Sequence, residues 1–180
     1  DKWHHGSLTK SMTATLAAGT CLLRPWRKDD AAALAREADN PRVARNLTHL
    51  FPHPYTLADA RFWIDHCLSG AEPLAWAIEA GGTLRGGLGV HRREGVFAHS
   101  AEIGYWLGEA HWGQGFASAA VAAACQHCFA ETDLLRLEAG VFAWNPASMR
   151  VLEKNGFRRE GSQRLGIRKA GELTDRILYG

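Results

Sequence analysis

The chain has 180 residues, of which 46% are hydrophobic and 22% charged, a balance typical of one globular domain rather than of a disordered or fibrous protein. Its formal net charge of +2 is too small to predict nucleic-acid binding, and no apolar run approaches the ~20 residues that a membrane-spanning helix requires. We therefore expect a soluble, cytoplasmic protein with no membrane partner and no direct nucleic-acid partner.

Residues 1–11 precede the first methionine and show neither periodicity nor the features of a signal peptide. We interpret this segment as a cloning remnant or as disordered chain. A single domain is then expected over residues 12–180.

The first half of the chain alternates between extended and helical patterns. "TCLLRPW" predicts a short strand that ends at a proline, and "KDDAAALAREAD" predicts a helix with Asp29 or Asp30 as its N-terminal cap. Two prolines exclude a helix in "THLFPHPY". "TLADARFWIDHCLSG" predicts a second helix, because Thr56 and Asp59 have the spacing of a capping box and Gly70 can end it.

The second half of the chain adds most of the expected sheet. "LAWAIEA", "LRGGLGVHRRE" and "SAEIGYWLG" are extended runs joined by glycine-rich turns, so we expect antiparallel neighbours. A helix from about Gly115 to Thr132, a strand "LRLEAGVF", a helix "PASMRVLEKN" and strands around "RREGSQRL" and "LTDRILY" follow. The sum is a single α+β layer fold with a mixed sheet.

The stretch "HWGQGFASAA" places Gly113 and Gly115 between a predicted strand and an alanine-rich helix. Glycines let a loop turn so that its amides join the unpaired N–H groups of the first helical turn, and together they can bind an anion. A Walker A loop requires Gly-Lys-Ser/Thr, but Phe116 and Ala117 follow Gly115. A dinucleotide fingerprint requires a third glycine, which "GQGFAS" lacks. Two explanations of the glycines remain: a site for the pyrophosphate of coenzyme A, or a tight turn that needs no ligand.

Cys125 and Cys128 form a C-x-x-C motif, a spacing that can hold zinc or support redox chemistry. They lie inside the helix-like run "AAVAAACQHCFA", and no second pair of ligands follows in the chain. We interpret both as buried small side chains and expect no metal. Neither has a base placed beside it by the sequence, so we expect no covalent catalysis through either thiol.

Several spaced segments carry a family resemblance. "WLGEAHWGQGFAS" resembles the acyl-coenzyme A binding signature of the GNAT superfamily of N-acetyltransferases, Arg/Gln-x-x-Gly-x-Gly/Ala. "NPASMRVLEKNGFRREG", "LRPW", "LFPHPYTLADARFWI" and "AEIGYWL" are similar to its RimJ/RimL-type branch, in the same order between Leu22 and Tyr179. The resemblance implies a GNAT-like, mostly antiparallel sheet with helices on both faces, and an enzyme similar to those that acetylate ribosomal-protein N-termini.

The resemblance also implies acetyl-coenzyme A as co-substrate and assigns residues to it. The backbone of Trp106 and Leu107 would pair with the pantetheine arm, and Asn145 would bond to the same arm, although a helix cap explains Asn145 equally. Trp112 replaces the family's Arg or Gln and offers one donor and no charge. Backbone amides would hold the pyrophosphate, aided by the helix dipole: Trp112, Gly113, Gln114, Gly115, Phe116, Ala117 and Ser118.

For catalysis, the resemblance implies that Ser148 is the acid that protonates the departing thiolate. The glutamate implicated as the base in the ribosomal-protein branch is replaced by Ile167, and the next carboxylate is Glu172. Glu102 remains the candidate base, acting through water, and a solvent-facing strand residue explains it equally. We expect direct attack by a primary amine, either a protein N-terminus or a small molecule, in a ternary complex.

The acceptor is expected between "NLTHLFPHPYT" and the final strands. His49, His53 and Tyr55 are candidate contacts, and ordinary loop polarity explains them equally well. Two alternatives stay open: a non-catalytic acyl-coenzyme A binding or sensing module and, more remotely, a nicotinamide dehydrogenase. A homodimer is compatible with the sequence, which identifies neither the acceptor nor the preferred acyl group.

Overall fold

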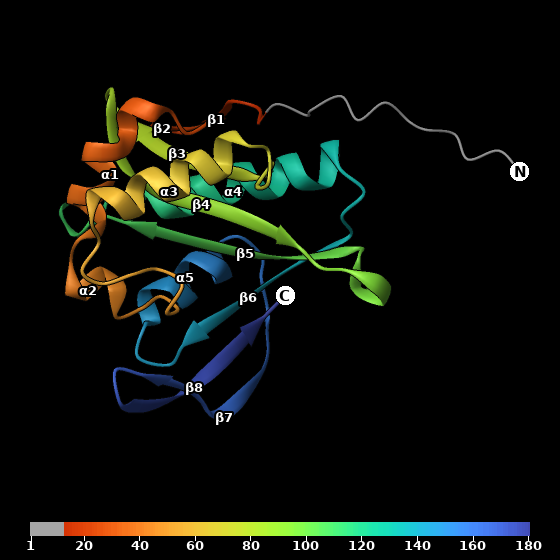
Figure 1. Cartoon of the computed structure of the whole chain (residues 1–180). Coiled ribbons are helices and arrows are strands. Elements are labelled where there is room, and N and C mark those ends of the chain that lie inside the picture. Colours follow the sequence, from red (N-terminus) through yellow and green to blue (C-terminus); the bar gives the residue numbers. More distant parts are fainter. Residues whose placement is uncertain (1–12) are drawn as a thin grey trace, which may run out of the picture.

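The computed structural model describes residues 13–180, so the expectation for residues 1–11 lies outside the described part of the chain. One eight-stranded sheet runs through it in the order β1-β2-β3-β4-β5-β6-β8-β7 (Figure 1). The α+β class with a mixed, mostly antiparallel sheet is confirmed. The strands are β1 (Leu16–Ala18), β2 (Cys21–Arg24), β3 (Ala75–Ala80), β4 (Thr83–Arg92), β5 (Ser100–Leu107), β6 (Arg136–Phe142), β7 (Arg159–Lys169) and β8 (Glu172–Tyr179).

The pairing of β5 with β6 decides the shape of the molecule. The two strands are parallel, and their register covers only Ser100 to Glu102 against Arg136 to Glu138. Beyond Glu102 the strands diverge, as Figure 1 shows where β6 descends away from β5. β4 stays paired with β5 as far as Leu107, so the opening lies on one side of β5 only.

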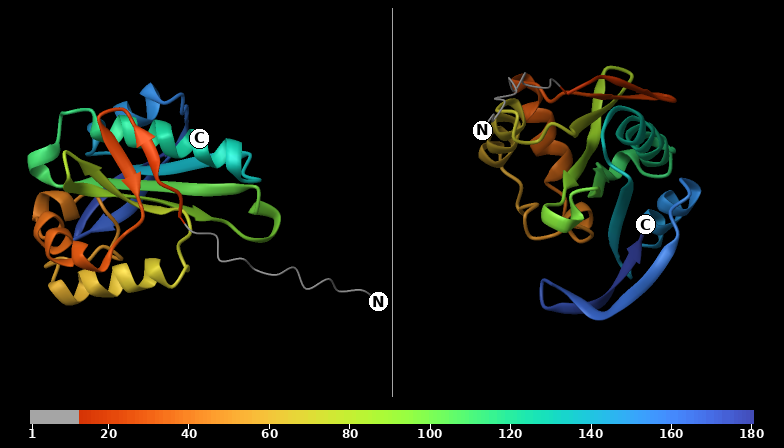
Figure 2. Two further views of the ribbon diagram at one scale, coloured as in Figure 1. Left: turned by 90° about the horizontal axis from the view of Figure 1, so that it is seen from above. Right: turned by 90° about the vertical axis from the view of Figure 1, so that its right-hand side faces the viewer.

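Helices cover both faces of the sheet, as expected (Figure 2). On one face α1 and α3 pack over Trp26, Ala77 and Leu84, and on the other face α4 packs on a larger core that includes Trp76 and Ile103. No helix among residues 13–180 is long and apolar enough to cross a membrane. The helices are α1 (Ala31–Ala38), α2 (Pro41–Ala44), α3 (Leu57–Leu68), α4 (Phe116–Glu131) and α5 (Pro146–Lys154), with 3-10 turns η1 (Lys28–Asp30), η2 (Gly95–Phe97) and η3 (Glu109–His111).

The sequence predicts side-chain caps for α1 and α3, and the structure shows one at α3 only. The capping box predicted for α3 is present: the Asp59 N–H donates to Thr56 Oγ1 at 3.1 Å, and the Thr56 N–H donates to Asp59 Oδ2 at 2.8 Å. The cap predicted for α1 is wrong in detail, because the Asp30 side chain makes no cap bond to that helix. Its carboxylate instead accepts two hydrogen bonds of 2.8 Å from the buried Arg24 guanidinium, which prefers this bidentate partner.

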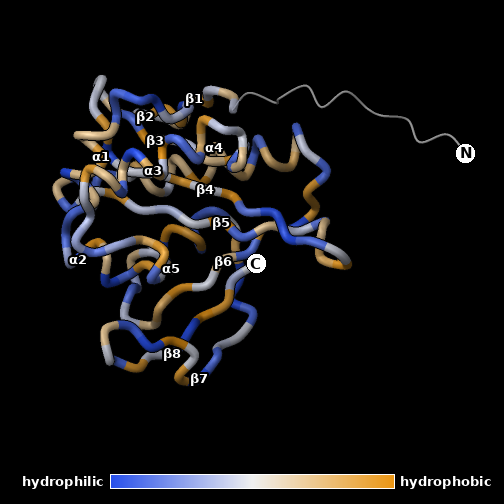
Figure 3. The backbone as a smooth tube through the Cα atoms, in the orientation of Figure 1, coloured by the Kyte–Doolittle hydropathy of each residue, from blue (hydrophilic) through white to orange (hydrophobic). Residues whose placement is uncertain are grey.

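The hairpin of β7 and β8 forms the far edge of the sheet. β8 pairs with β6, and β7 pairs with the outer side of β8. β7 is therefore the edge strand, although it comes before β8 in the chain. Most residues of β7 are hydrophilic and exposed, and Figure 3 shows the hydropathy of the hairpin, which agrees with an exposed sheet edge. This edge faces the segment between α2 and α3, and the second of the two cavities described below lies between them.

Candidate functional site

The divergence of β5 from β6 opens a cleft of about 350 Å³. Its walls are the two strands, the starts of α4 and α5, and the segment that follows α2. The structure brings most of the sequence-predicted site residues together here. Those that line the cleft are Glu102, Trp106, Leu107, Trp112, Gly113, Ala117, Asn145 and Ser148.

The edge of β5 beside the cleft offers backbone hydrogen-bonding groups. Because β6 leaves β5 after Glu102, the stretch from Ile103 to Leu107 has no strand partner on that side. Backbone groups in such a position bond to water or to an added extended chain. The Trp106 side chain lies away from this edge and packs against Phe51, with ring centroids 5.3 Å apart. Gly87 makes room for it, since a Cβ there would lie 2.8 Å from Trp106 Nε1.

The indole N–H of Trp112 is used in a hydrogen bond within the protein and is not a free donor to the cleft. It donates to the Leu107 carbonyl at 3.0 Å, which ties the end of β5 to the loop that follows. The Arg42 guanidinium lies 5.6 Å from the centroid of the Trp112 ring, and it also forms an ion pair with Glu109 at 3.1 Å. A positive charge therefore stands beside the position where the family pattern has Arg or Gln.

The loop before α4 is shaped as an anion site requires. Gly113 and Gly115 have φ angles of +73° and +83°, a left-handed conformation that favours glycine. A Cβ at either position would meet no protein atom within 4 Å, so both glycines border open space. Among the described residues no side chain caps α4, whereas Thr56 and Asn145 cap α3 and α5. The first-turn amides of α4 and its dipole are thus left for a ligand.

Three predicted residues of this loop turn their side chains elsewhere. The Gln114 amide donates to the Ala110 carbonyl at 3.2 Å, and the Phe116 ring is buried in the core. Ser118 Oγ accepts a 3.3 Å bond from the side chain of Asn155. Their remaining contribution to a ligand is the backbone N–H, in keeping with a site built from amides.

At the start of α5, Ser148 lies beside a residue that the sequence analysis missed. Ser148 Oγ is 2.8 Å from the hydroxyl of Tyr105 on β5. Burial raises the pKa of Tyr105 to about 12, so the phenol stays protonated at neutral pH and can donate. Asn145 Oδ1 accepts a 3.3 Å bond from the Ser148 N–H, which shows that the cap explanation holds for that oxygen. Strand alternation puts Tyr105 on the same face as Ile103 and could have identified it.

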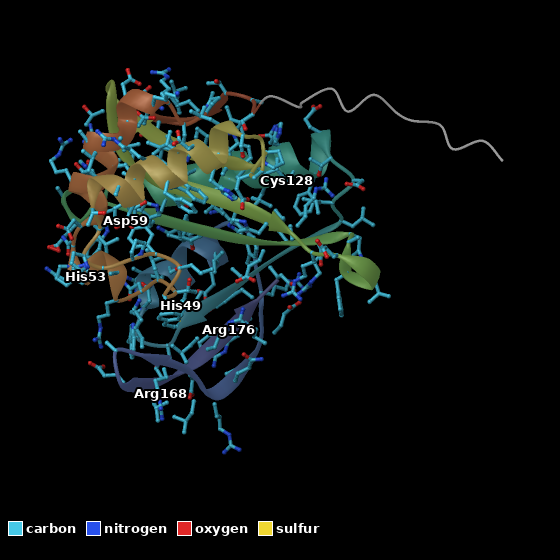
Figure 4. The ribbon with its side chains drawn as sticks, viewed as in Figure 1. His49, His53, Asp59, Cys128, Arg168 and Arg176 are labelled. Atoms are coloured by element: carbon cyan, nitrogen blue, oxygen red, sulfur yellow. The ribbon has the colours of Figure 1, made fainter. Side chains whose placement is uncertain are left out.

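Glu102 approaches the cleft from the other face of β5. Alternation along the strand separates Glu102 and Trp106 from Tyr105, so Glu102 and Ser148 flank the cleft from opposite sides. The Glu102 side chain is 45% exposed, and the Arg176 guanidinium of β8 lies 3.6 Å from it. Figure 4 labels Arg176, beside β6 and β8.

A second cavity of about 840 Å³ lies between α2, the segment that follows it, and the β7–β8 hairpin. His49, His53, Ile167 and Arg168 line it; Figure 4 labels both histidines and Arg168. Thr48 and Phe142 line both cavities, so the two adjoin at the mouth of the cleft.

Tyr55, a candidate acceptor contact, and Glu172, the next carboxylate after Ile167, both have other roles. Tyr55 is only 7% exposed and packs against Phe51 with ring centroids 5.0 Å apart, so it belongs to the core rather than to the cavity wall. Burial raises the pKa of Tyr55 to about 12. Glu172 accepts bonds of 3.1 and 3.2 Å from Arg45, which lower its pKa, so this carboxylate is held in an ion pair at the rim.

The two cysteines of the C-x-x-C motif lie in α4. Burial raises the pKa of Cys125 to about 12 and that of Cys128 to about 11, which disfavours the nucleophilic thiolate at neutral pH. Within residues 13–180, no three His, Cys, Asp or Glu side chains lie together as metal ligands would.

The model of the acetyltransferase (GNAT) domain family matches residues 21–158. The chain is 45% identical over 76 residues to "Probable N-acetyltransferase YjcK" of Bacillus subtilis, a match that covers 42% of each chain. It is 44% identical over 62 residues to the ribosomal-protein-serine acetyltransferase of Escherichia coli, covering 34% of this chain and 35% of that one. The aligned segments thus span less than half of these curated relatives. The solved structure of Mycobacterium smegmatis RimJ in complex with CoA-disulfide is similar with a TM-score of 0.78 and 30% identity, over 93% of this chain and 86% of that chain.

Proposed function

The chain belongs to the GNAT acetyltransferase family, and we propose that it transfers an acetyl group from acetyl-coenzyme A to a primary amine in a ternary complex. One observation carries this proposal: a single cleft unites an unpaired strand edge, an uncapped helix start and the Ser148–Tyr105 hydroxyl pair. The unpaired strand edge can bind an extended amide chain, the uncapped helix start can bind an anion, and the hydroxyl pair can donate a proton.

We assign the parts of acetyl-coenzyme A to the parts of the cleft accordingly. The backbone of β5 at Trp106 and Leu107 would pair with the pantetheine arm, together with Asn145. The amide nitrogen of Asn145 suits this role, because it has no hydrogen-bond partner among residues 13–180. The loop amides from Trp112 to Ser118 would hold the pyrophosphate, with Arg42 nearby as a counter-charge.

The proposed chemistry places one proton-handling group on each side of the cleft. As the amine nitrogen bonds to the acetyl carbon and the carbon–sulfur bond breaks, Glu102 receives the amine proton through a water. Ser148 gives its hydroxyl proton to the departing sulfur and takes another from the Tyr105 hydroxyl. Solvent then reprotonates Tyr105. The protonated thiols of Cys125 and Cys128 play no part, so no acyl-enzyme forms.

The proposed acceptor is an amine of low pKa, either a protein N-terminus or a small molecule. At pH 7 about a tenth of an α-amine with pKa near 8 is neutral, against about four parts in ten thousand of a lysine near 10.4. Supplying the neutral form thus costs roughly 1.4 kcal/mol for an α-amine and roughly 4.6 kcal/mol for lysine. A relative named as a ribosomal-protein-serine acetyltransferase supports a protein acceptor. We place the protein in the cytoplasm, where its four free cysteines would stay reduced.

Product formation separates this proposal from a non-catalytic coenzyme A binding module. The protein is incubated with acetyl-coenzyme A and a panel of small amines and N-terminal peptides. Release of free thiol and the mass of one added acetyl group on the acceptor are then followed. We expect both products in equal amounts. Tight binding of acetyl-coenzyme A with no product above the uncatalysed rate would show a binding module instead.

A further inference from the structure

The charged residues that line the second cavity are all of types that carry positive charge. Its lining residues include six whose side chains are cationic or can become so: Arg42, Arg45, His49, His53, Arg168 and Lys169. No Asp or Glu of the part of the chain that the structure describes lines it. A concave surface of one sign concentrates ligands of the opposite charge, because its field is less screened than that of a flat surface.

Carboxylates at the rim compensate only part of this charge. Arg42 pairs with Glu109, and Arg45 pairs with Glu172, each at 3.1 Å. The carboxylate of Asp39 lies 3.8 Å from His53 Nδ1.

On the hairpin side of the cavity the charge has no partner. Within residues 13–180 neither Arg168 nor Lys169 has a carboxylate within ion-pair distance. Burial lowers the pKa of Lys169, the effect expected of an ammonium group that has lost water without gaining a partner. Glu172 lies opposite Lys169 in the register of the hairpin, but its carboxylate pairs with Arg45 at 3.1 Å. The β7 end of the wall therefore keeps an excess of positive charge.

This cationic wall leads directly to the site of the proposed transfer. Thr48 and Phe142 line both cavities, so an acceptor whose amine reaches the cleft between β5 and β6 can extend past them into the second cavity. A volume of about 840 Å³ is enough for several groups beyond the amine.

We propose that the acceptor carries carboxylate or phosphate groups close to its amine, and that Arg168 and Lys169 select it by binding those groups. The inference rests on the proposed function, since it names the class of acceptor used at that site. Short acidic N-terminal peptides and small amines with a carboxylate or phosphate share this chemistry. Selection acts on binding, because neither side chain reaches the reacting atoms in the first cleft.

The first arm of the test compares three peptides that differ only in charge, Ser-Asp-Asp, Ser-Gln-Gln and Ser-Lys-Lys, each with an amidated C-terminus. We expect kcat/KM to fall in that order at low salt, and the differences to shrink as ionic strength rises. O-Phosphoserine is assayed beside them: faster turnover than Ser-Asp-Asp would identify a small-molecule source, and slower turnover a peptide source. Equal kcat/KM for all three peptides would overturn the proposal.

Variants assign the preference to the hairpin. Arg168→Gln and Lys169→Gln should each lower kcat/KM for Ser-Asp-Asp by about two- to fivefold, the range for a single exposed ion pair, mainly through KM. Neither should affect Ser-Gln-Gln. Arg164→Gln is the matched control, because Arg164 is exposed on β7 and does not line the cavity. If Arg164→Gln weakened the preference as much, general surface charge rather than the cavity would be responsible.

A second arm works even if no transfer occurs. Fluorescent, N-acetylated forms of the three peptides are titrated against the protein, and anisotropy reports their binding. Tighter binding of the acidic form, lost in Arg168→Gln with Lys169→Gln, would support the inference even if the proposed transfer failed. Transfer without any charge preference in either arm would overturn the inference and leave the proposed function standing.

Discussion

Three hydrogen bonds hold Ser148 in place, and in one of them its backbone carbonyl accepts from the Tyr105 hydroxyl at 3.2 Å. Asn145 holds the Ser148 N–H at the start of α5, and the Tyr105 hydroxyl lies 2.8 Å from Ser148 Oγ. Because the pKa of Tyr105 is raised to about 12, the phenol remains a donor at any pH used for assay. Ser148 can therefore pass on its own proton and recover one from a neighbour.

Ser148→Ala should lower kcat with little change in the affinity for acetyl-coenzyme A. A proton given to the leaving thiolate stabilises only the transition state, and general acid catalysis is typically worth about 10²- to 10⁴-fold. Tyr105→Phe should lower kcat by a smaller factor, because the serine hydroxyl remains. Ser162→Ala, on exposed β7, is the control. A loss below about threefold in Ser148→Ala would assign proton donation to water.

Glu102→Gln should reduce turnover most near pH 6 and least at high pH. If Glu102 orders the water that takes the amine proton, its loss matters less once the acceptor is already neutral, above the α-amine pKa of about 8. Tyr105, with a pKa of about 12, does not titrate in this range and leaves the profile unchanged. Glu131→Gln, at the exposed end of α4, is the control. A deficit that stays constant with pH would assign Glu102 to structure or binding.

Among the elements, the loop before α4 and the diverging strands do most to create the cleft. The loop could be predicted because its glycines, its helix and the strand before it all have local signatures. The divergence of β6 from β5 and the insertion of β8 between β6 and β7 depend on pairings between distant segments, which no local pattern encodes. β1 and α2 have three and four residues, too few to show a period.

Gly115→Ala should abolish most of the stabilisation by coenzyme A, whereas Gly95→Ala should not. Both glycines have positive φ, +83° and +62°, and a Cβ at either meets no protein atom within 4 Å. The backbone strain of the two variants should therefore be similar, and both should melt somewhat below the wild type without ligand. At Gly115 the new methyl group lies where the proposed pyrophosphate approaches the loop. Equal ligand-induced shifts of Tm in the two variants would show that the pyrophosphate does not bind at this loop.

At the scale of the whole molecule, two cavities adjoin at the open sheet edge, and we propose that one holds the acyl donor and the other the acceptor. The sequence predicted most of the residues that line the cleft between β5 and β6, because glycines and helix starts have local signatures. Of the second cavity it predicted the two wall segments and both histidines, but not the burial of Tyr55 or the arginines Arg42 and Arg45. Tyr55 has a polar tip and an apolar ring, and only tertiary packing buries it. Likewise, Arg42 and Arg168 lie far apart in the chain and meet only in the folded cavity.

The most direct test of the account measures thermal unfolding of the intact protein with acetyl-coenzyme A and with NAD. A ligand that binds only the folded state at a hundredfold excess over its Kd adds about 2.7 kcal/mol of stability. For a chain of this size that corresponds to a rise in Tm of roughly 5–10 °C. We predict this rise with acetyl-coenzyme A and none with NAD. A rise with NAD and none with acetyl-coenzyme A would contradict the assignment of the cleft between β5 and β6.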